Sequence, residues 1–188
     1  METSTPPLSP PAGRGRGRLL LVAVLFAAPI VVALVLRAVG WEPAGLRNFG
    51  QLLDPPVALA DTPARTPEGL PLDWTAGERG FNLLAQAPAR CEADCAALYD
   101  SLHRVWLSQG RHADRVRVLW AGPLPDGAER YAGLQPVRVP AALAARLPAR
   151  APGAPAVDLV DGRGFLALHY PAGFDPSGLR KDLARLLK

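Results

Sequence analysis

Residues 81–95 read FNLLAQAPARCEADC, and this stretch decides the fold. It begins with a short apolar run, residues 81–85, which ends before Pro88 and is typical of a buried strand. Apolar residues then recur at steps of four and three, the spacing of one helix face: Cys91, Cys95, Leu98, Leu102 and Val105. The stretch therefore predicts a strand followed by a helix over residues 92–109, which Gly110 ends.

The elements after this helix are short. Residues 116–121 (VRVLWA) predict a second strand, and residues 141–147 a short alanine-rich helix. Residues 156–160 and 165–170 flank Asp161-Gly162-Arg163-Gly164 and predict a hairpin. A last helix, capped by Asp175 or Ser177, runs to Leu187. The leading β-α-β unit implies parallel strands and the hairpin adds antiparallel ones, so we expect an α/β, thioredoxin-like domain.

An uncharged apolar run precedes this domain, from Leu19 to Leu36. Its length in a helix, about 27 Å, matches the hydrocarbon layer of a bilayer. Three arginines stand just before the run, so the N-terminus should be cytoplasmic and the C-terminal domain periplasmic, in a single-pass protein of the bacterial inner membrane. A cleaved signal peptide is the alternative, but the run is longer than a usual signal core and Arg37 follows it directly.

Composition divides the chain into four parts. We predict a disordered cytoplasmic tail over residues 1–18, a transmembrane helix over 19–37, a proline-rich stalk over 38–72 and a thioredoxin-like domain over 73–188. Of the 21 Lys and Arg residues, four flank the apolar run, and of the 17 Asp and Glu residues only Glu2 precedes it. The exported part therefore has a net charge of only +1. A nucleic-acid partner is not expected, because no basic stripe is visible.

Cys91 and Cys95 are the only two cysteines, and they lie four residues apart. On a helix both sulfurs share one face, and the unpaired N–H groups at a helix start favour thiolates. Such a pair can cycle between dithiol and disulfide or hold Cu(I). The negative charges of Glu92 and Asp94 would raise the pKa of the nearby thiols and so act against the effect of the helix start. A static disulfide, inert core packing and a degenerate site are the alternatives.

No histidine completes a copper site with the pair. His103 lies about 12 Å further along the same helix and cannot reach it. His112 follows the helix end and should be exposed, and His169 at the end of the last strand fits a structural or interfacial role. The third ligand is therefore not identified, copper is the only cofactor considered, and no Ser-His-Asp, P-loop or Rossmann pattern is present.

At this point the chain resembles the Sco/SenC family, and more closely the small proteobacterial membrane proteins associated with cytochrome c oxidase assembly. The matching segments are residues 48–56 (NFGQLLDPP), the CEADC motif, residues 157–165 (VDLVDGRGF), residues 169–171 (HYP) and residues 178–188 (GLRKDLARLLK). The resemblance implies a membrane-anchored thioredoxin fold whose partners are the lipid bilayer and a respiratory oxidase subunit or copper chaperone.

Two positions depart from that family. Ala96 stands where Sco-type proteins have a proline, and residues 151–155 (APGAP) lack their copper-binding histidine. Pro155 instead suggests the cis-proline that thioredoxin-like proteins keep beside their cysteines.

Two functions follow, and whether the protein is an enzyme is left open. The first is an oxidase-assembly factor that acts as a thiol reductant or Cu(I) carrier through Cys91 and Cys95. The second is a non-catalytic scaffold with a structural or vestigial cysteine pair, for which an exposed Trp106 or Trp120 would matter more. A general disulfide oxidoreductase fits less well, because those enzymes place two residues between their cysteines and not three.

Overall fold

The computed structural model describes residues 14–39, 48–75, 80–90 and 93–188. The chain divides into two compact units, Met1–Leu46 and Arg47–Lys188, each of which is described by itself.

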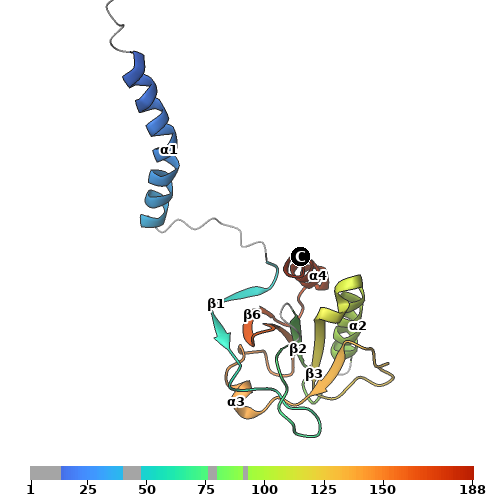
Figure 1. Ribbon diagram of the computed structural model, residues 1–188. Coiled ribbons are helices and arrows are strands. Elements are labelled where there is room, and N and C mark those ends of the chain that lie inside the picture. The colour runs from blue at the N-terminus through green and yellow to red at the C-terminus, as the bar shows by residue number, and fades with distance from the viewer. Residues whose placement is uncertain (1–13, 40–47, 76–79, 91–92) are drawn as a thin grey trace, which may run out of the picture. The chain divides into compact units, whose positions relative to one another are not determined.

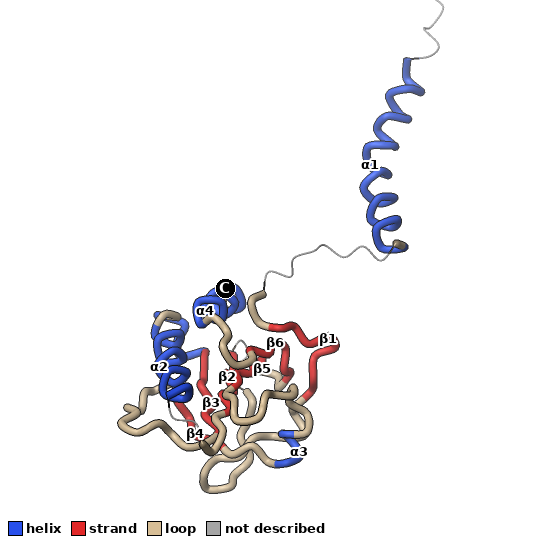
Figure 2. Tube along the Cα trace, turned by 180° about the vertical axis from the view of Figure 1, so that it is seen from behind, coloured by secondary structure: helices blue, strands red, loops and turns tan. Residues whose placement is uncertain are grey.

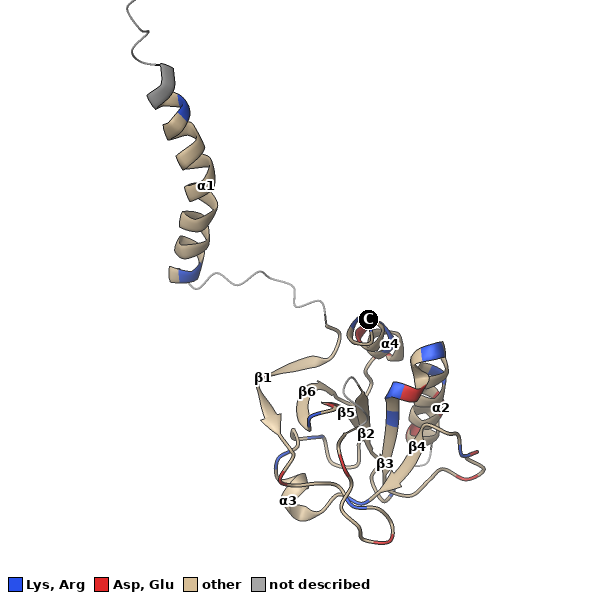
Figure 3. Cartoon of the chain, viewed as in Figure 1, with Lys and Arg blue, Asp and Glu red and all other residues tan. Residues whose placement is uncertain are grey.

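The first unit contains one helix, α1 (Arg14–Ala38). Its segment Gly17–Ala38 has 22 residues and a mean hydropathy of 3.2, which is long and apolar enough to cross a membrane. No charged residue lies between Arg18 and Arg37, and Figure 3 shows the long middle part of α1 without blue or red. Large apolar side chains along α1 are exposed, such as Phe26 at 72%. The helix predicted over residues 19–37 is therefore present and is a candidate membrane span, but it begins at Arg14, within the segment predicted as a disordered tail, whose residues 1–13 lie outside the described ranges.

The second unit is built on one six-stranded sheet with the order β1-β6-β5-β2-β3-β4 (Figures 1 and 2). The strands are β1 (Gln51–Ala58), β2 (Phe81–Gln86), β3 (Val116–Ala121), β4 (Leu134–Val137), β5 (Ala156–Asp161) and β6 (Phe165–Tyr170). β2 pairs in parallel with β3, and β3 with β4, whereas β2–β5, β5–β6 and β6–β1 are antiparallel. The predicted parallel β-α-β unit and antiparallel hairpin are thus confirmed.

The helices divide the apolar residues between the two faces of the sheet. Helices α2 (Ala93–Leu107) and α4 (Pro176–Leu186) pack on the face that carries Leu83 and Ala85, while α3 (Ala141–Ala144) packs on the face that carries Leu84. A 3-10 helix, η1 (Gly110–Arg115), joins α2 to β3. Neighbouring residues of a strand point to opposite faces, so one apolar run supplies both cores.

The stalk was predicted over residues 38–72; residues 40–47 of it lie outside the described residues, and residues 48–72 differ from an extended stalk. The compact unit begins at Arg47, β1 pairs with β6, and Leu59, Ala64 and Leu72 are buried. The prolines are compatible with a strand because β1 lies at the sheet edge and its pairing register shifts between Leu52 and Val57, around Pro55 and Pro56. β4, which contains Pro136, is likewise an edge strand that the sequence did not predict.

Candidate functional site

The cysteine motif lies where the central strand β2 leads into α2. Cys95 falls in the first turn of α2, is 2% exposed, and packs in the core between that helix and the sheet. It is not a free thiol in this structure. Cys91 and Glu92 lie outside the described residues. The structure therefore places one of the two predicted redox residues, and a Cys91–Cys95 bond stays a prediction.

A groove of about 350 Å³ opens beside this motif. Its walls are Asp94, Leu98 and Ser101 from α2, together with Pro155 and the loop around Phe174. Pro155 does therefore lie near the start of α2. The prediction of a cis bond before it is wrong, because Asp54–Pro55 is the cis peptide bond of the described chain and Ala154–Pro155 is trans.

The three histidines lie in three different environments. His103 on α2 stacks on Tyr131, with ring centroids 4.2 Å apart, and His112 in η1 accepts a hydrogen bond from Arg111. His169 on β6 is 4% exposed and pairs with Asp158. In the described ranges, no three His, Cys, Asp or Glu side chains lie close enough together to hold a metal ion. The structural role predicted for His169 agrees with its burial.

Asp158 on β5 forms the first of two buried networks, on the sheet face opposite α2. It is completely buried; its Oδ1 lies 2.7 Å from Nδ1 of His169, and its Oδ2 accepts a 2.6 Å hydrogen bond from the Gln86 amide. All three residues lie on adjacent strands, β2, β5 and β6. Sequence reasoning did not select Asp158, although one carboxylate within the apolar strand AVDLVD was a signal.

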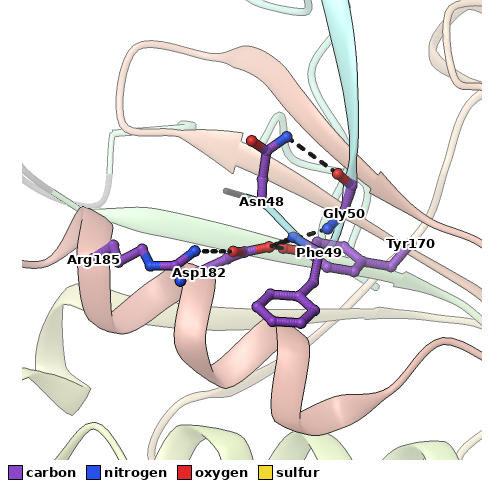
Figure 4. Close-up of polar contacts among 6 residues, drawn as sticks. All are labelled: Asn48, Phe49, Gly50, Tyr170, Asp182 and Arg185. Atoms are coloured by element: carbon purple, nitrogen blue, oxygen red, sulfur yellow. Dashed lines mark hydrogen bonds and ion pairs between the residues drawn. The ribbon is translucent and has the colours of Figure 1, made fainter. Parts of the chain in front are cut away.

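Asp182 on α4 forms the second network (Figure 4). This carboxylate is 3% exposed, and its Oδ2 accepts hydrogen bonds from the backbone N–H groups of Phe49 (2.7 Å) and Gly50 (3.0 Å) and from the hydroxyl of Tyr170 (2.8 Å). Arg185 donates to Oδ1 at 3.4 Å. The network attaches the first described residues of the compact unit to its last helix.

The close packing around Asp182 affects the pKa of Tyr170 and the space beside two glycines. Burial, followed by the hydrogen bond to Asp182, raises the pKa of Tyr170 well above its ordinary value. Space is also restricted here: a Cβ on Gly50 would lie 2.6 Å from the Tyr170 ring, and a Cβ on Gly178 would lie 2.6 Å from Cβ of Phe49. The network was missed in the sequence, where the signal was an aspartate on the apolar face of the last helix.

Trp106 and Trp120 do not form the exposed surface that the scaffold hypothesis expected. Trp120 is completely buried, and its indole N–H donates to the backbone oxygen of Pro123. Trp106 is half-buried, and its indole N–H contacts the backbone oxygens of Ala113 and Val116. Both rings are therefore part of the packing around α2.

Comparison with solved structures gives chains of similar fold. The crystal structure of Trgpx in apo form is 12% identical, with a TM-score of 0.51, and the match covers 69% of this chain and 95% of that chain. Apo Sco1 from Thermus thermophilus is 20% identical (TM-score 0.47; 74% and 96% covered), and Bradyrhizobium japonicum ScoI with copper bound is 14% identical (TM-score 0.45; 73% and 98% covered). No curated protein matches the sequence.

A family model gives the assignment. The model described as transmembrane-like, thioredoxin-like, C-terminal domain matches residues 81–188, from the first residue of β2 to the end of the sequence. The matched segment contains the β2–α2 junction, the hairpin and α4. Because it covers more than half of the chain, the protein belongs to this family of transmembrane-like, thioredoxin-like domains.

Proposed function

We propose that this membrane-anchored thioredoxin-like protein assists the assembly of a respiratory oxidase, by thiol redox chemistry or Cu(I) handling at Cys91 and Cys95. The position of Cys95 carries the proposal: it lies in the first turn of the helix that directly follows the central strand. The only other cysteine stands four residues earlier. The resemblance of the sequence to oxidase-assembly proteins supplies the class of client.

As a reductant, the pair would transfer two electrons to a client disulfide. The Cys91 thiolate attacks one client sulfur, forms a mixed disulfide and releases the second client sulfur as a thiolate. The Cys95 thiolate then attacks the Cys91 sulfur and releases the first client sulfur. The client gains two thiols, the pair becomes a disulfide, and an external dithiol must reduce it before another cycle. The groove beside Pro155 and Phe174, which Asp94 also lines, offers the client chain a place beside the start of α2.

As a carrier, the pair would hold Cu(I) as cargo, because two thiolates are soft ligands that prefer this ion. His103 is stacked on Tyr131 and His169 is paired with Asp158, so neither is assigned as the third ligand. A ligand from the client or from the delivering copper chaperone would complete the coordination during transfer.

We further propose that the protein is a single-pass protein of the bacterial inner membrane, with a cytoplasmic N-terminus and a periplasmic C-terminal domain. The three arginines at the start of α1, before its apolar run, support this orientation. Protease added to spheroplasts should then digest the C-terminal domain and leave α1 with the cells, whereas a domain digested only after lysis would reverse the orientation.

The decisive experiment combines Cu(I) titration with a redox measurement on the full chain in detergent. Stoichiometric Cu(I) binding against a competing chelator, lost in Cys91→Ser/Cys95→Ser and kept in the control His112→Ala, supports the carrier. A reduction potential above roughly −300 mV supports the reductant. No Cu(I) binding together with a lower potential would overturn both and leave a scaffold with a structural disulfide. In cells, unchanged oxidase activity and copper content in the double serine variant would exclude a role in oxidase assembly.

A further inference from the structure

The exposed side of α4 is strongly basic. Arg180, Lys181 and Arg185 on α4 and Lys188 just after it are exposed, whereas the single acidic residue of the helix, Asp182, is buried in the network described above. From Ala38 onward the chain has a net charge of only +1, so these four cations are a local concentration of positive charge.

Apolar side chains stand among these cations. Phe49 is 53% exposed, with Nζ of Lys181 5.0 Å and Cζ of Arg185 5.8 Å from its ring centroid. Leu52 and Leu186 are also exposed, and both line a cavity of about 380 Å³ between β1 and α4. Exposed aromatic and leucine side chains between basic residues are typical of surfaces that lie at a lipid–water boundary.

The Asp182 network holds this surface together. Asp182 accepts the backbone N–H of Phe49, and Gly178 lets Phe49 lie directly against α4, because a Cβ there would be 2.6 Å from Cβ of Phe49. Figure 4 shows the Phe49 ring beside the helix, with its backbone turned toward Asp182. The aromatic ring and the two cations over it, Lys181 and Arg185, therefore belong to one fixed surface.

Chain length keeps this surface close to a bilayer. Phe49 follows Ala38, the last residue of the candidate span, by eleven positions. Even fully extended, that segment reaches only about 40 Å. A tether of this length gives the surface a high effective concentration at the headgroups of the membrane that holds α1.

We infer that the surface formed by Phe49, Leu52, Leu186 and the basic residues of α4 docks on anionic phospholipid headgroups of the membrane in which α1 is anchored. The cations match the negative headgroups, and the three apolar side chains enter the boundary of the acyl region. Docking would fix the orientation of the thioredoxin-like domain on the membrane. This inference rests on α1 spanning the bilayer and does not depend on the chemistry of the cysteines.

The sequence offers a direct probe, because Lys181 and Lys188 are the only lysines of the chain. The full chain is reconstituted into nanodiscs of phosphatidylcholine alone, or with 30% phosphatidylglycerol, and treated with a water-soluble amine reagent. Labelling of Lys181, followed by mass spectrometry, should be at least about fivefold slower with the anionic lipid, since one cation near such a surface contributes about that factor. Salt at 0.5 M should remove the difference by screening.

Two variants with the same change of charge separate docking from a general charge effect. Arg180→Glu alters the basic surface and should abolish most of the slowing, whereas Arg130→Glu, exposed in the loop before β4, should retain it. Co-purification of each variant with the nanodiscs checks that α1 is inserted. Equal labelling in the two lipids, or an equal effect of the two variants, would overturn the inference. Slowing only after a membrane extract is added would assign the surface to a protein partner instead.

Discussion

Two aspartates are buried on opposite sides of the sheet. Each of them contacts one of two consecutive residues of β6. His169 pairs with Asp158, and Tyr170 donates to Asp182. The partners of Asp158 are side chains from neighbouring strands, whereas Asp182 also accepts two backbone N–H groups, those of Phe49 and Gly50. The first network therefore joins strands that are already paired, and the second attaches a segment that precedes the sheet in the chain.

The difference has an energetic consequence. Side-chain donors such as Gln86 and His169 can rotate toward other acceptors or be replaced. Backbone donors are fixed by the path of the chain, and a buried backbone N–H without an acceptor is costly. Asp182 should therefore contribute more to stability than Asp158, although both carboxylates are buried.

The largest effect is expected from Asp182→Ala. It removes the acceptor of two backbone N–H groups and of the Tyr170 hydroxyl, so the free energy of unfolding should fall by about 4 kcal/mol. Asp182→Asn keeps one side-chain oxygen and should lose about half as much. Urea denaturation of the full chain in detergent, followed by tryptophan fluorescence, measures both changes. If Asp182→Ala lowered the free energy of unfolding by less than Asp158→Ala does, the comparison of the two networks would be wrong.

Asp158→Ala should lower the free energy of unfolding by about 3 kcal/mol, because the Gln86 amide and His169 lose a shared buried partner. Phe49 and Gly50 are not involved, so proteolysis near the start of β1 should be unchanged, whereas Asp182→Ala should accelerate it. Asp158→Asn is the matched control, since it preserves the shape and one acceptor. Equal acceleration in the Asp158→Ala protein would show that the two networks are not separable.

Alkaline pH gives the smallest of the three effects. The pKa of Tyr170 is raised in the folded protein, so its contribution to stability is complete below the unfolded pKa of 10.0 and is lost as the pH rises above it. Above pH 10 the free energy of unfolding should fall by up to about 1.4 kcal/mol per pH unit for this group.

Tyr170→Phe tests that assignment. Burial also raises the pKa values of Tyr99 and Tyr131, so the variant should retain part of the alkaline decline and lose only the share due to Tyr170. Denaturant titrations at pH 8, 10 and 11 provide the slopes. If the free energy of unfolding fell with pH at the same slope in the wild-type protein and in Tyr170→Phe, the hydroxyl of Tyr170 would not be held in its neutral form beside Asp182.

Local patterns predicted most elements of the matched domain. β3 and β6 begin and end at the predicted residues, and Asp175 caps α4 through the N–H of Ser177. Apolar periodicity and turn residues are local signals, and the right-handed β-α-β rule then leaves few topologies. β1 and β4 were missed because proline weakens the strand signal, although it is tolerated at sheet edges.

The site was predicted only in part. The cysteine spacing and its position before a helix were visible in the sequence, and Cys95 lies where the pattern places it. The trans bond before Pro155 and the burial of Trp120 were not predictable, because both depend on how distant segments pack. The same holds for Asp158 and Asp182, whose partners lie up to 133 residues away along the chain.

The sequence by itself therefore determined the apolar helix, the thioredoxin-like order of elements and the cysteine pair, because each of these is specified by residues close together in the chain. Only the tertiary structure decided that residues 51–58 join the sheet and that Phe49 lies on α4. These contacts depend on a carboxylate that becomes buried beside backbone donors from the other end of the domain. Such pairing has no local pattern, since its energy arises only when both segments leave water together.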